Sequence, residues 1–242
     1  MRFVLGAEIW LALTAAIAVH EIAHAGVARR RGVTVREVSV GIGPTICTVL
    51  PRFLGAPVKI CLFPILGACR YEDHNAPRGA VAWSAAAGPL ASIAIGILVL
   101  GITNGLAGLA AAGEVAAAVP DALRELFRAF VEWRAPHPAS IVLPRMHHGA
   151  ISVSALFSIL LGVTNLLPVP PLDGWKVVSG IFRIPTMQKL DPVLEVFGTI
   201  VTTSVFVLPY AAPYIPRATA LGALISGSAA GMAFVLIRGR GR

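Results

Sequence analysis

The chain has 242 residues, of which 56% are hydrophobic and 13% are charged, and its mean hydropathy is +0.78. A soluble domain of this length cannot bury so much apolar surface, so the composition excludes an ordinary soluble protein and favours a polytopic membrane protein. The net charge of +8 predicts anionic membrane lipids as partners. No basic patch is interleaved with aromatic residues, so we expect no nucleic-acid partner.

The first apolar run, residues 3–28, is long enough to cross a hydrocarbon layer of about 30 Å. It also resembles a secretory signal peptide, because Arg2 precedes it and Ala16-Ile17-Ala18 has the small-residue pattern of a cleavage site. Glu8 within the apolar stretch argues against that alternative, as does the stop sequence Arg29-Arg30-Arg31 beyond it. We therefore predict a membrane span that is retained in the protein.

This first span contains the motif His20-Glu21-Ile22-Ala23-His24. On a helix the two histidines stand one turn apart on the same face, close enough for both imidazoles to bind one Zn²⁺ while Glu21 serves as general base. The alternative is a pair of helix-end histidines that backbone carbonyls or interfacial water satisfy. Ionisable residues are costly inside a membrane, and this cost favours a functional site. A third metal ligand must then come from elsewhere in the chain.

A small β-hairpin region is predicted between the first and second spans, over residues 33–72. Apolar and polar residues alternate in 33–40 and in 58–62, which indicates two short strands. The alternation slips at Arg36-Glu37, as it would at a β-bulge. Gly41-Ile42-Gly43-Pro44 is predicted to be a turn or loop.

Four later stretches also have the length and composition of membrane spans, namely residues 80–102, 149–167, 196–212 and 218–237. Between the first two of these, segment 104–148 carries apolar residues at helical spacing: Leu123, Leu126, Phe127, Phe130 and Trp133. This spacing predicts an amphipathic helix that lies on the outer interface or packs over the bundle. The predicted fold class is therefore an all-α polytopic membrane protein with about five transmembrane helices and a small membrane-associated β-hairpin region.

Lys and Arg residues predict the orientation of this bundle. If the N-terminus lies outside, most of the basic residues fall in the inner segments, as the positive-inside rule expects. We therefore predict a multi-pass integral protein of a bacterial or archaeal inner or cell membrane, with its histidine site toward the cytoplasmic side. Hydrolysis at that depth requires a water-filled cavity open to the cytoplasm.

Asp173 is the candidate third ligand on the same side. It follows the 149–167 span, in a segment whose three prolines, Pro168, Pro170 and Pro171, forbid a regular helix. Irregular backbone at membrane depth is tolerated where it is buried in protein or lines a wet cavity. A turn that ends in Asp173-Gly174 could aim a carboxylate at a metal on a neighbouring helix, although an ordinary cap or turn residue explains Asp173 equally well.

The HExxH motif in the first span and the later sequence Asn165-Leu166-Leu167-Pro168-Val169-Pro170-Pro171-Leu172-Asp173-Gly174 together resemble the site-2 protease family of intramembrane metalloproteases. The resemblance implies that His20, His24 and Asp173 hold Zn²⁺ and that Glu21 is the base. It also implies that Asn165 positions the substrate carbonyl or the oxyanion. The resemblance covers residues 1–180 as a catalytic membrane core; residues 181–242 contribute only spans and a basic tail.

Two positions depart from the family pattern. Gly88-Pro89-Leu90-Ala91-Ser92 resembles its GPxxN sequence but has Ser92 where asparagine is usual, which puts a substrate-positioning role there in doubt. Trp175 follows Asp173-Gly174 in place of a second glycine. Neither departure touches the proposed ligands or base.

The function predicted from these features is intramembrane proteolysis by a zinc metalloendopeptidase. The expected partner is a transmembrane protein substrate, cleaved in or near its transmembrane segment. The alternative is a catalytically silent membrane scaffold or metal-binding transporter that uses the same cluster only to bind an ion. A transporter would be expected to show internal repeats and paired discontinuous spans, which the sequence lacks.

Overall fold

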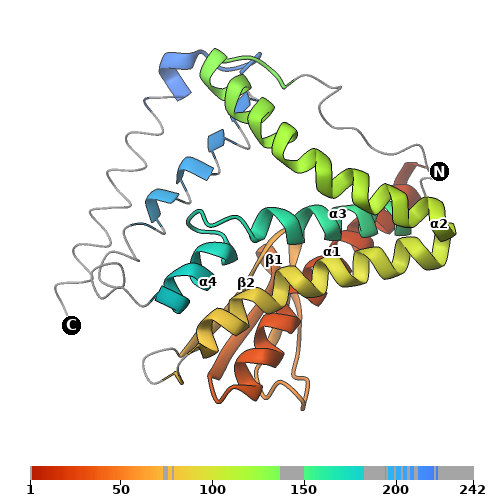
Figure 1. Ribbon diagram of the computed structural model, residues 1–242, viewed down its shortest axis with the longest axis vertical. Helices are drawn as coiled ribbons and strands as arrows, with labels where there is room; N and C mark the ends of the chain where they lie inside the picture. Colours follow the sequence, from red (N-terminus) through yellow and green to blue (C-terminus); the bar gives the residue numbers. More distant parts are fainter. Residues whose placement is uncertain are drawn as a thin grey trace.

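The computed structural model describes residues 2–72, 76–77, 79–136 and 150–182, together with 194, 196–198, 200–202, 204–205, 208–209, 212–220 and 222. Its elements follow one another as α1 (Arg2–Arg30), β1 (Thr34–Val49), β2 (Val58–Glu72), α2 (Ala80–Glu132), α3 (Ala150–Asn165) and α4 (Asp173–Phe182), as Figure 1 shows. The part of the chain listed above is thus mostly helical, with one two-stranded antiparallel sheet.

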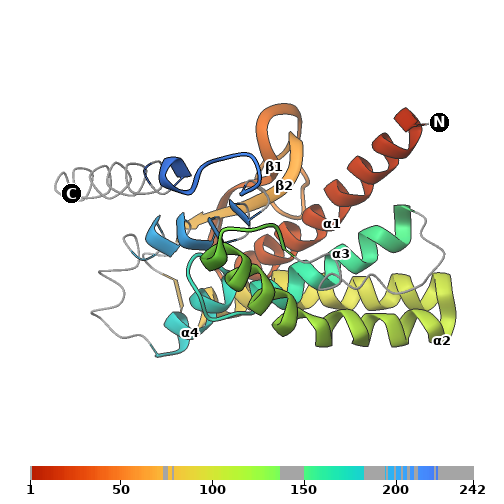
Figure 2. The same ribbon diagram turned by 90° about the horizontal axis from the view of Figure 1, so that it is seen from above.

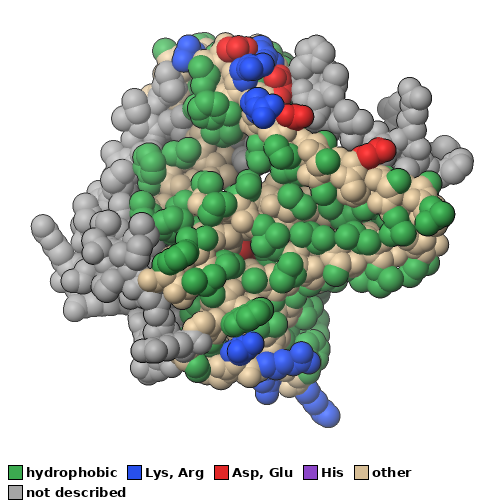
Figure 3. All heavy atoms as spheres, in the orientation of Figure 1, with side chains coloured by type: hydrophobic (Ala, Val, Ile, Leu, Met, Phe, Trp, Pro, Cys, Tyr) green, Lys and Arg blue, Asp and Glu red, His purple; other side chains and the backbone are tan. Residues whose placement is uncertain are grey.

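Among the described residues, two helices are long and apolar enough to cross a membrane, Trp10–Arg30 within α1 and Ala80–Glu132. Figure 3 shows hydrophobic side chains across the middle of one face, with most of the charged groups gathered at two ends. The predicted span 149–167 corresponds to α3, an apolar helix of 16 residues. The described residues between 194 and 209 are helical, whereas most of 218–237 lies outside the described residues. The count of five spans therefore stays a prediction.

Helix α1 ends in a Schellman motif that turns the chain into the hairpin. Gly32 has a φ of 78°, in the left-handed region that glycine adopts without strain. The Gly32 N–H donates to the Arg29 carbonyl (3.0 Å) and the Val33 N–H to the Ala28 carbonyl (2.9 Å). This cap satisfies the last carbonyls of the helix and starts β1 directly beside it.

The hairpin confirms one local prediction and corrects another. Val35 pairs with Tyr71 and Glu37 with Arg70, so Arg36 is the extra residue of a bulge, as the slipped alternation predicted. The turn predicted at 41–44 is wrong, because β1 continues to Val49 and the chain reverses between the two strands. Gly41 and Gly43 have φ values of 88° and 92°, so they bend β1 without ending it. A Cβ on Gly41 would lie 2.6 Å from the Phe63 carbonyl oxygen.

The hairpin packs along the side of α1. Buried residues of the two elements, of the connecting segments and of the start of α2 form one core: Ile17, Ala25, Ala28, Val33, Val35, Val38, Val40, Leu54, Ala56, Val58 and Ala80. Two hydrogen bonds join α1 to the hairpin region. One runs from the Trp10 indole N–H to the Leu62 carbonyl (2.6 Å) and the other from Arg29 Nη1 to the Phe53 carbonyl (3.0 Å). The hairpin therefore extends beside the membrane-length part of α1, from one end to the other.

Helix α2 breaks at Gly105 and folds back on itself. Gly105 has φ 58° and ψ −140°, and the helix resumes after it and runs back at an angle to its first half (Figures 1 and 2). A Cβ on Gly108 would lie 2.1 Å from the Leu100 carbonyl oxygen, so glycine permits the close approach at this corner. The first half of α2 thus ends close to residue 102, the predicted end of this span, and the chain is helical again from the break to Glu132. The helical pattern predicted around Leu123–Trp133 lies on this returning half.

Small residues bring α2 and α3 close together. A Cβ on Gly96 would lie 2.6 Å from the Ala155 carbonyl oxygen, and one on Gly162 would lie 2.5 Å from the Pro89 carbonyl oxygen. Such contacts allow the backbones of membrane helices to approach closely. The chain is not helical between Asn165 and Asp173, as its prolines predicted.

Candidate metal centre

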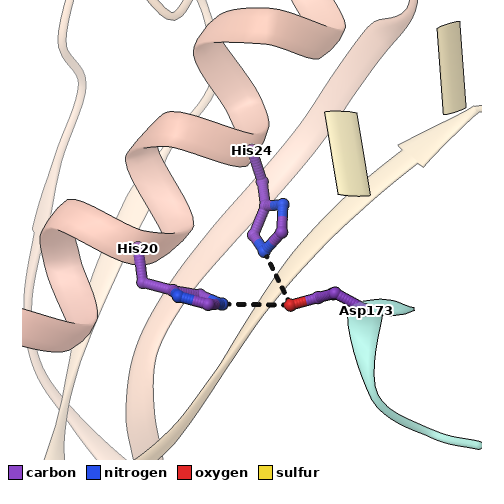
Figure 4. Close-up of side chains that lie close together, drawn as sticks. All are labelled: His20, His24 and Asp173. Atoms are coloured by element: carbon purple, nitrogen blue, oxygen red, sulfur yellow. Dashed lines mark hydrogen bonds and ion pairs between the residues drawn. The ribbon is translucent and has the colours of Figure 1, made fainter. Parts of the chain in front are cut away.

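Three side chains from two distant parts of the sequence converge beside α1. His20 and His24 project from successive turns of α1 toward Asp173, the first residue of α4 (Figure 4). The Asp173 Oδ2 atom lies 3.1 Å from His20 Nε2 and 3.2 Å from His24 Nε2. One ligand atom from each residue lies within 4.8 Å of the others, and this is the only such cluster in the described part of the chain.

The sequence after α3 explains how Asp173 reaches α1. The irregular turn folds back on the end of α3, so that a Cβ on Gly174 would lie 2.3 Å from the Leu166 carbonyl oxygen and 2.4 Å from that of Leu167. Only glycine fits there. Asp173 then occupies the first turn of α4, where the helix dipole favours a carboxylate.

The second nitrogen of each imidazole also has a partner, and both partners lie on α2. His24 Nδ1 donates to the Ser84 carbonyl at 2.7 Å. His20 Nδ1 lies 2.9 Å from Ser92 Oγ. Both histidines are about 95% buried, so these bonds fix the two rings with their Nε2 atoms toward Asp173. Metal-binding histidines typically have such a partner on their other nitrogen.

This donor set fits a divalent zinc ion. Two imidazole nitrogens and one carboxylate oxygen are the three-ligand set of many catalytic zinc sites, which keep a fourth position open. The His24 ring supports the fit. Because the Ser84 carbonyl can only accept a hydrogen bond, a neutral His24 ring holds its proton on Nδ1 and presents a lone pair at Nε2. That lone pair faces a carboxylate oxygen 3.2 Å away, an arrangement that a bridging cation would stabilise.

A cavity of about 290 Å³ opens beside the cluster. Glu21 lines it and is buried, and its carboxylate lies against the backbone of β2, where a Cβ on Gly67 would come 2.5 Å from Glu21 Oε1. The structure thus places the predicted base and the three predicted ligands around one cavity. Strand residues 66–69 form part of the wall.

Asn165, the last residue of α3, also lines this cavity. Its amide donates one hydrogen bond to the Leu161 carbonyl of its own helix, at 2.9 Å. An amide group has two N–H donors, so this bond leaves a second N–H for another acceptor. The substrate-positioning role of Asn165 stays a prediction.

Sequence reasoning missed four residues of this site. Lys176 lines the cavity one turn after Asp173. Its helical spacing from Asp173 could have indicated that both side chains lie on the same face of α4. Ser92 is fully buried against His20, although the sequence put only a substrate-positioning role for it in doubt. Gly67 and Gly88 leave room for Glu21 and His24; a Cβ on Gly88 would lie 2.2 Å from His24 Nε2. No signal in a single sequence marks such contacts.

Cys69 lines the same cavity as a free thiol. Burial raises the pKa of the Cys69 thiol to about 12, so it stays protonated and is a poor nucleophile at neutral pH. This thiol is therefore a wall of the cavity and not a reactive group in it.

Comparison with known proteins agrees with this chemistry. The sequence matches the family described as Peptidase family M50 over residues 8–208. It is 42% identical over 45 residues to a Thermotoga maritima protein named "Putative zinc metalloprotease", and 34% identical over 62 residues to "Putative zinc metalloprotease SA1105" of Staphylococcus aureus strain N315. These matches cover 19% and 24% of this chain and only 9% and 14% of the two relatives.

Proposed function

The chain belongs to Peptidase family M50, a family of membrane-embedded metalloproteases, and from this premise we propose that it is an intramembrane zinc endopeptidase of the site-2 type. Its proposed reaction is hydrolysis of a peptide bond in or near the transmembrane segment of a membrane protein, as in regulated intramembrane proteolysis. The observation that carries the proposal is the convergence of His20, His24 and Asp173 next to a cavity that also contains Glu21.

In this proposal His20 Nε2, His24 Nε2 and an Asp173 carboxylate oxygen hold the zinc. When bound, zinc would lower the pKa of a water molecule toward 7 and polarise the scissile carbonyl. The two imidazoles are held by α2 and the carboxylate by the turn before α4, so the ligand geometry is set before any substrate arrives.

Glu21 is the proposed general base. Its carboxylate is adjacent in sequence to His20 and points into the cavity wall formed by β2, where it can take a proton from the attacking water and later give it to the leaving amine. Asn165 is proposed to donate to the substrate carbonyl or to the oxyanion that forms from it.

The substrate is proposed to bind in an extended form. Peptide bonds of a membrane helix are shielded by their own hydrogen bonds, so the segment must unwind before attack. Strand residues 67–69 border the cavity and, among the residues that the structure describes, pair with β1 along one edge only. The second edge is suited to strand addition, in which a main chain is held by main-chain hydrogen bonds.

Anionic lipids are the proposed surroundings of the cytoplasmic end of α1. Arg30 and Arg31 lie at the end of this helix, and the Arg31 guanidinium lies 5.2 Å from the centre of the Trp83 ring. Basic and aromatic side chains together are typical of the headgroup region. We propose the N-terminus outside and the metal centre toward the cytoplasm of a bacterial or archaeal cell.

The test is a comparison of purified wild type with Glu21→Gln. Zinc per chain is measured, together with cleavage of a single-span model substrate that contains a helix-breaking residue. Both proteins are expected to hold zinc, and the variant is expected to lose about 10²-fold or more of the cleavage rate because it lacks the base. Asp173→Ala is the control, which should lose zinc as well as cleavage.

Two outcomes would contradict the proposal. Full activity of Glu21→Gln would show that Glu21 is not the base. Zinc in wild type without cleavage would favour the silent scaffold or the metal-binding transporter over the protease.

A further inference from the structure

Ser92 lies where α2 crosses the metal centre. Its side chain has no exposed surface, and its hydroxyl oxygen lies 2.9 Å from His20 Nδ1. This is one of the two positions at which the chain departs from the family pattern. The residue thus contacts a proposed ligand from the side opposite to Asp173.

The two histidines have chemically different partners. The Ser84 carbonyl beside His24 can only accept a hydrogen bond, whereas the Ser92 hydroxyl beside His20 can donate or accept one. As an acceptor, Ser92 keeps the proton of a neutral His20 ring on Nδ1 and leaves the lone pair on Nε2, where a metal would bind.

The hydroxyl also suits the site without a metal. If Ser92 donates to Nδ1, the His20 proton moves to Nε2, which then donates to Asp173 Oδ2 at 3.1 Å. When Ser92 donates, both nitrogens of His20 are paired without a metal; when it accepts, Nδ1 is paired and Nε2 is free to bind the metal. This matters because an unpaired buried polar group is costly. A side chain that only accepts or only donates would satisfy one arrangement and not the other.

We propose that Ser92 is a positioning residue that orients the His20 ring and, as a hydrogen-bond acceptor, stabilises the tautomer that binds the metal. The proposal rests on the proposed zinc site and deepens it. Ser92 acts through His20 and does not contact the metal. Its effect should therefore be on metal affinity and on the geometry of the metal, beyond any effect on activity.

Zinc affinity of the full chain, measured by competition with a chelator, is the first test. Ser92→Ala is expected to bind zinc about 10- to 100-fold more weakly than wild type, the usual effect of losing such a partner. Ser154→Ala is the matched control. It also removes a serine hydrogen bond to α1, from Ser154 Oγ to the Ala12 carbonyl at 2.7 Å, but it touches no imidazole, so its zinc affinity should stay near that of wild type.

A second pair of variants separates the hydroxyl from the packing. Ser92→Thr and Ser92→Val add groups of nearly equal shape, but only threonine keeps a hydroxyl. Threonine is expected to retain most of the zinc affinity and valine to lose it. Absorption spectra with Co²⁺ in place of zinc supply a readout of ligand geometry, and the bands should shift in the alanine and valine variants only.

The outcomes distinguish this proposal from the function on which it rests. Equal zinc affinity and equal cobalt spectra in wild type, Ser92→Ala and Ser92→Val would overturn the role of Ser92 and leave the protease intact. Equal loss in the threonine and valine variants would also overturn it, since the hydroxyl would then be irrelevant. No zinc in wild type would overturn the proposed function, and this assignment with it.

Discussion

Gly88 and Gly67 show how tightly the backbone surrounds the metal centre. Each supplies space next to a chemical group, Gly88 next to His24 Nε2 and Gly67 next to the Glu21 carboxylate. A side chain at either position would occupy the volume where ligand or base must lie. Neither position can therefore take a side chain without displacing the ligand or the base.

Gly88→Ala is expected to lower zinc affinity by about tenfold or more. The new Cβ would lie 2.2 Å from His24 Nε2, and the ring cannot turn away without losing its bond to the Ser84 carbonyl. Chelator competition measures the effect. Gly113→Ala is the control on the same helix, because nothing lies within 4 Å of its Cβ. Equal zinc affinity in both variants would show that the close approach is unimportant.

The residues that carry the chemistry of the site could be predicted from the sequence, but the groups that hold these residues in place could not. His20, Glu21, His24 and Asp173 belong to short patterns whose residue types already limit the chemistry, and the structure brings all four to one cavity. The Ser84 carbonyl and Gly88 become relevant only once α1 and α2 are packed. Such a contact depends on the crossing of two helices, which no local pattern encodes.

At the scale of elements, the turn between α3 and α4 decides whether the third ligand reaches α1. Three prolines keep residues 166–172 out of a helix, and Gly174 allows the turn to close on the carbonyls of Leu166 and Leu167. Asp173 is thus positioned by a loop that is held at both ends by helices.

Gly174→Ala is expected to weaken zinc binding and to destabilise the protein by about 1–3 kcal/mol, because its Cβ would lie 2.3 Å from a backbone oxygen that cannot move cheaply. Zinc affinity and thermal unfolding measure the two effects. Gly26→Ala on α1, with nothing within 4 Å of its Cβ, should show neither. An unchanged zinc affinity in Gly174→Ala would mean that the turn tolerates a shift without moving Asp173.

Element types were easier to predict than their ends. The alternation in β1 and β2 predicted strands and a bulge, both of which are present. Gly41-Ile42-Gly43-Pro44 predicts a turn, since glycine followed by proline is typical of turns. In the folded hairpin the partner strand continues past them, and pairing outweighs the local preference. Likewise, Gly105 breaks α2 without ending it, because the returning half packs against the first.

At the scale of the whole molecule, a bound zinc would join α1 to α4, elements that lie about 150 residues apart in sequence. Binding to the folded state alone stabilises it by about 2.7 kcal/mol at a free zinc concentration of 100 times Kd. Removing zinc with a chelator is therefore expected to lower Tm by about 5 °C or more. Asp173→Ala, which lacks a ligand, should show little further change on chelation. An equal decrease in both proteins would indicate that the chelator acts elsewhere.

The hydrogen bond from His24 Nδ1 to the backbone carbonyl of Ser84 has an evolutionary consequence. A peptide carbonyl belongs to every residue, so no replacement of the side chain at position 84 removes the bond that orients His24. The partner of His20 is a side chain and can change through a single codon. Natural variation in how firmly such a centre retains its metal can therefore accumulate at position 92, while the other histidine is protected by the continuity of the helix itself.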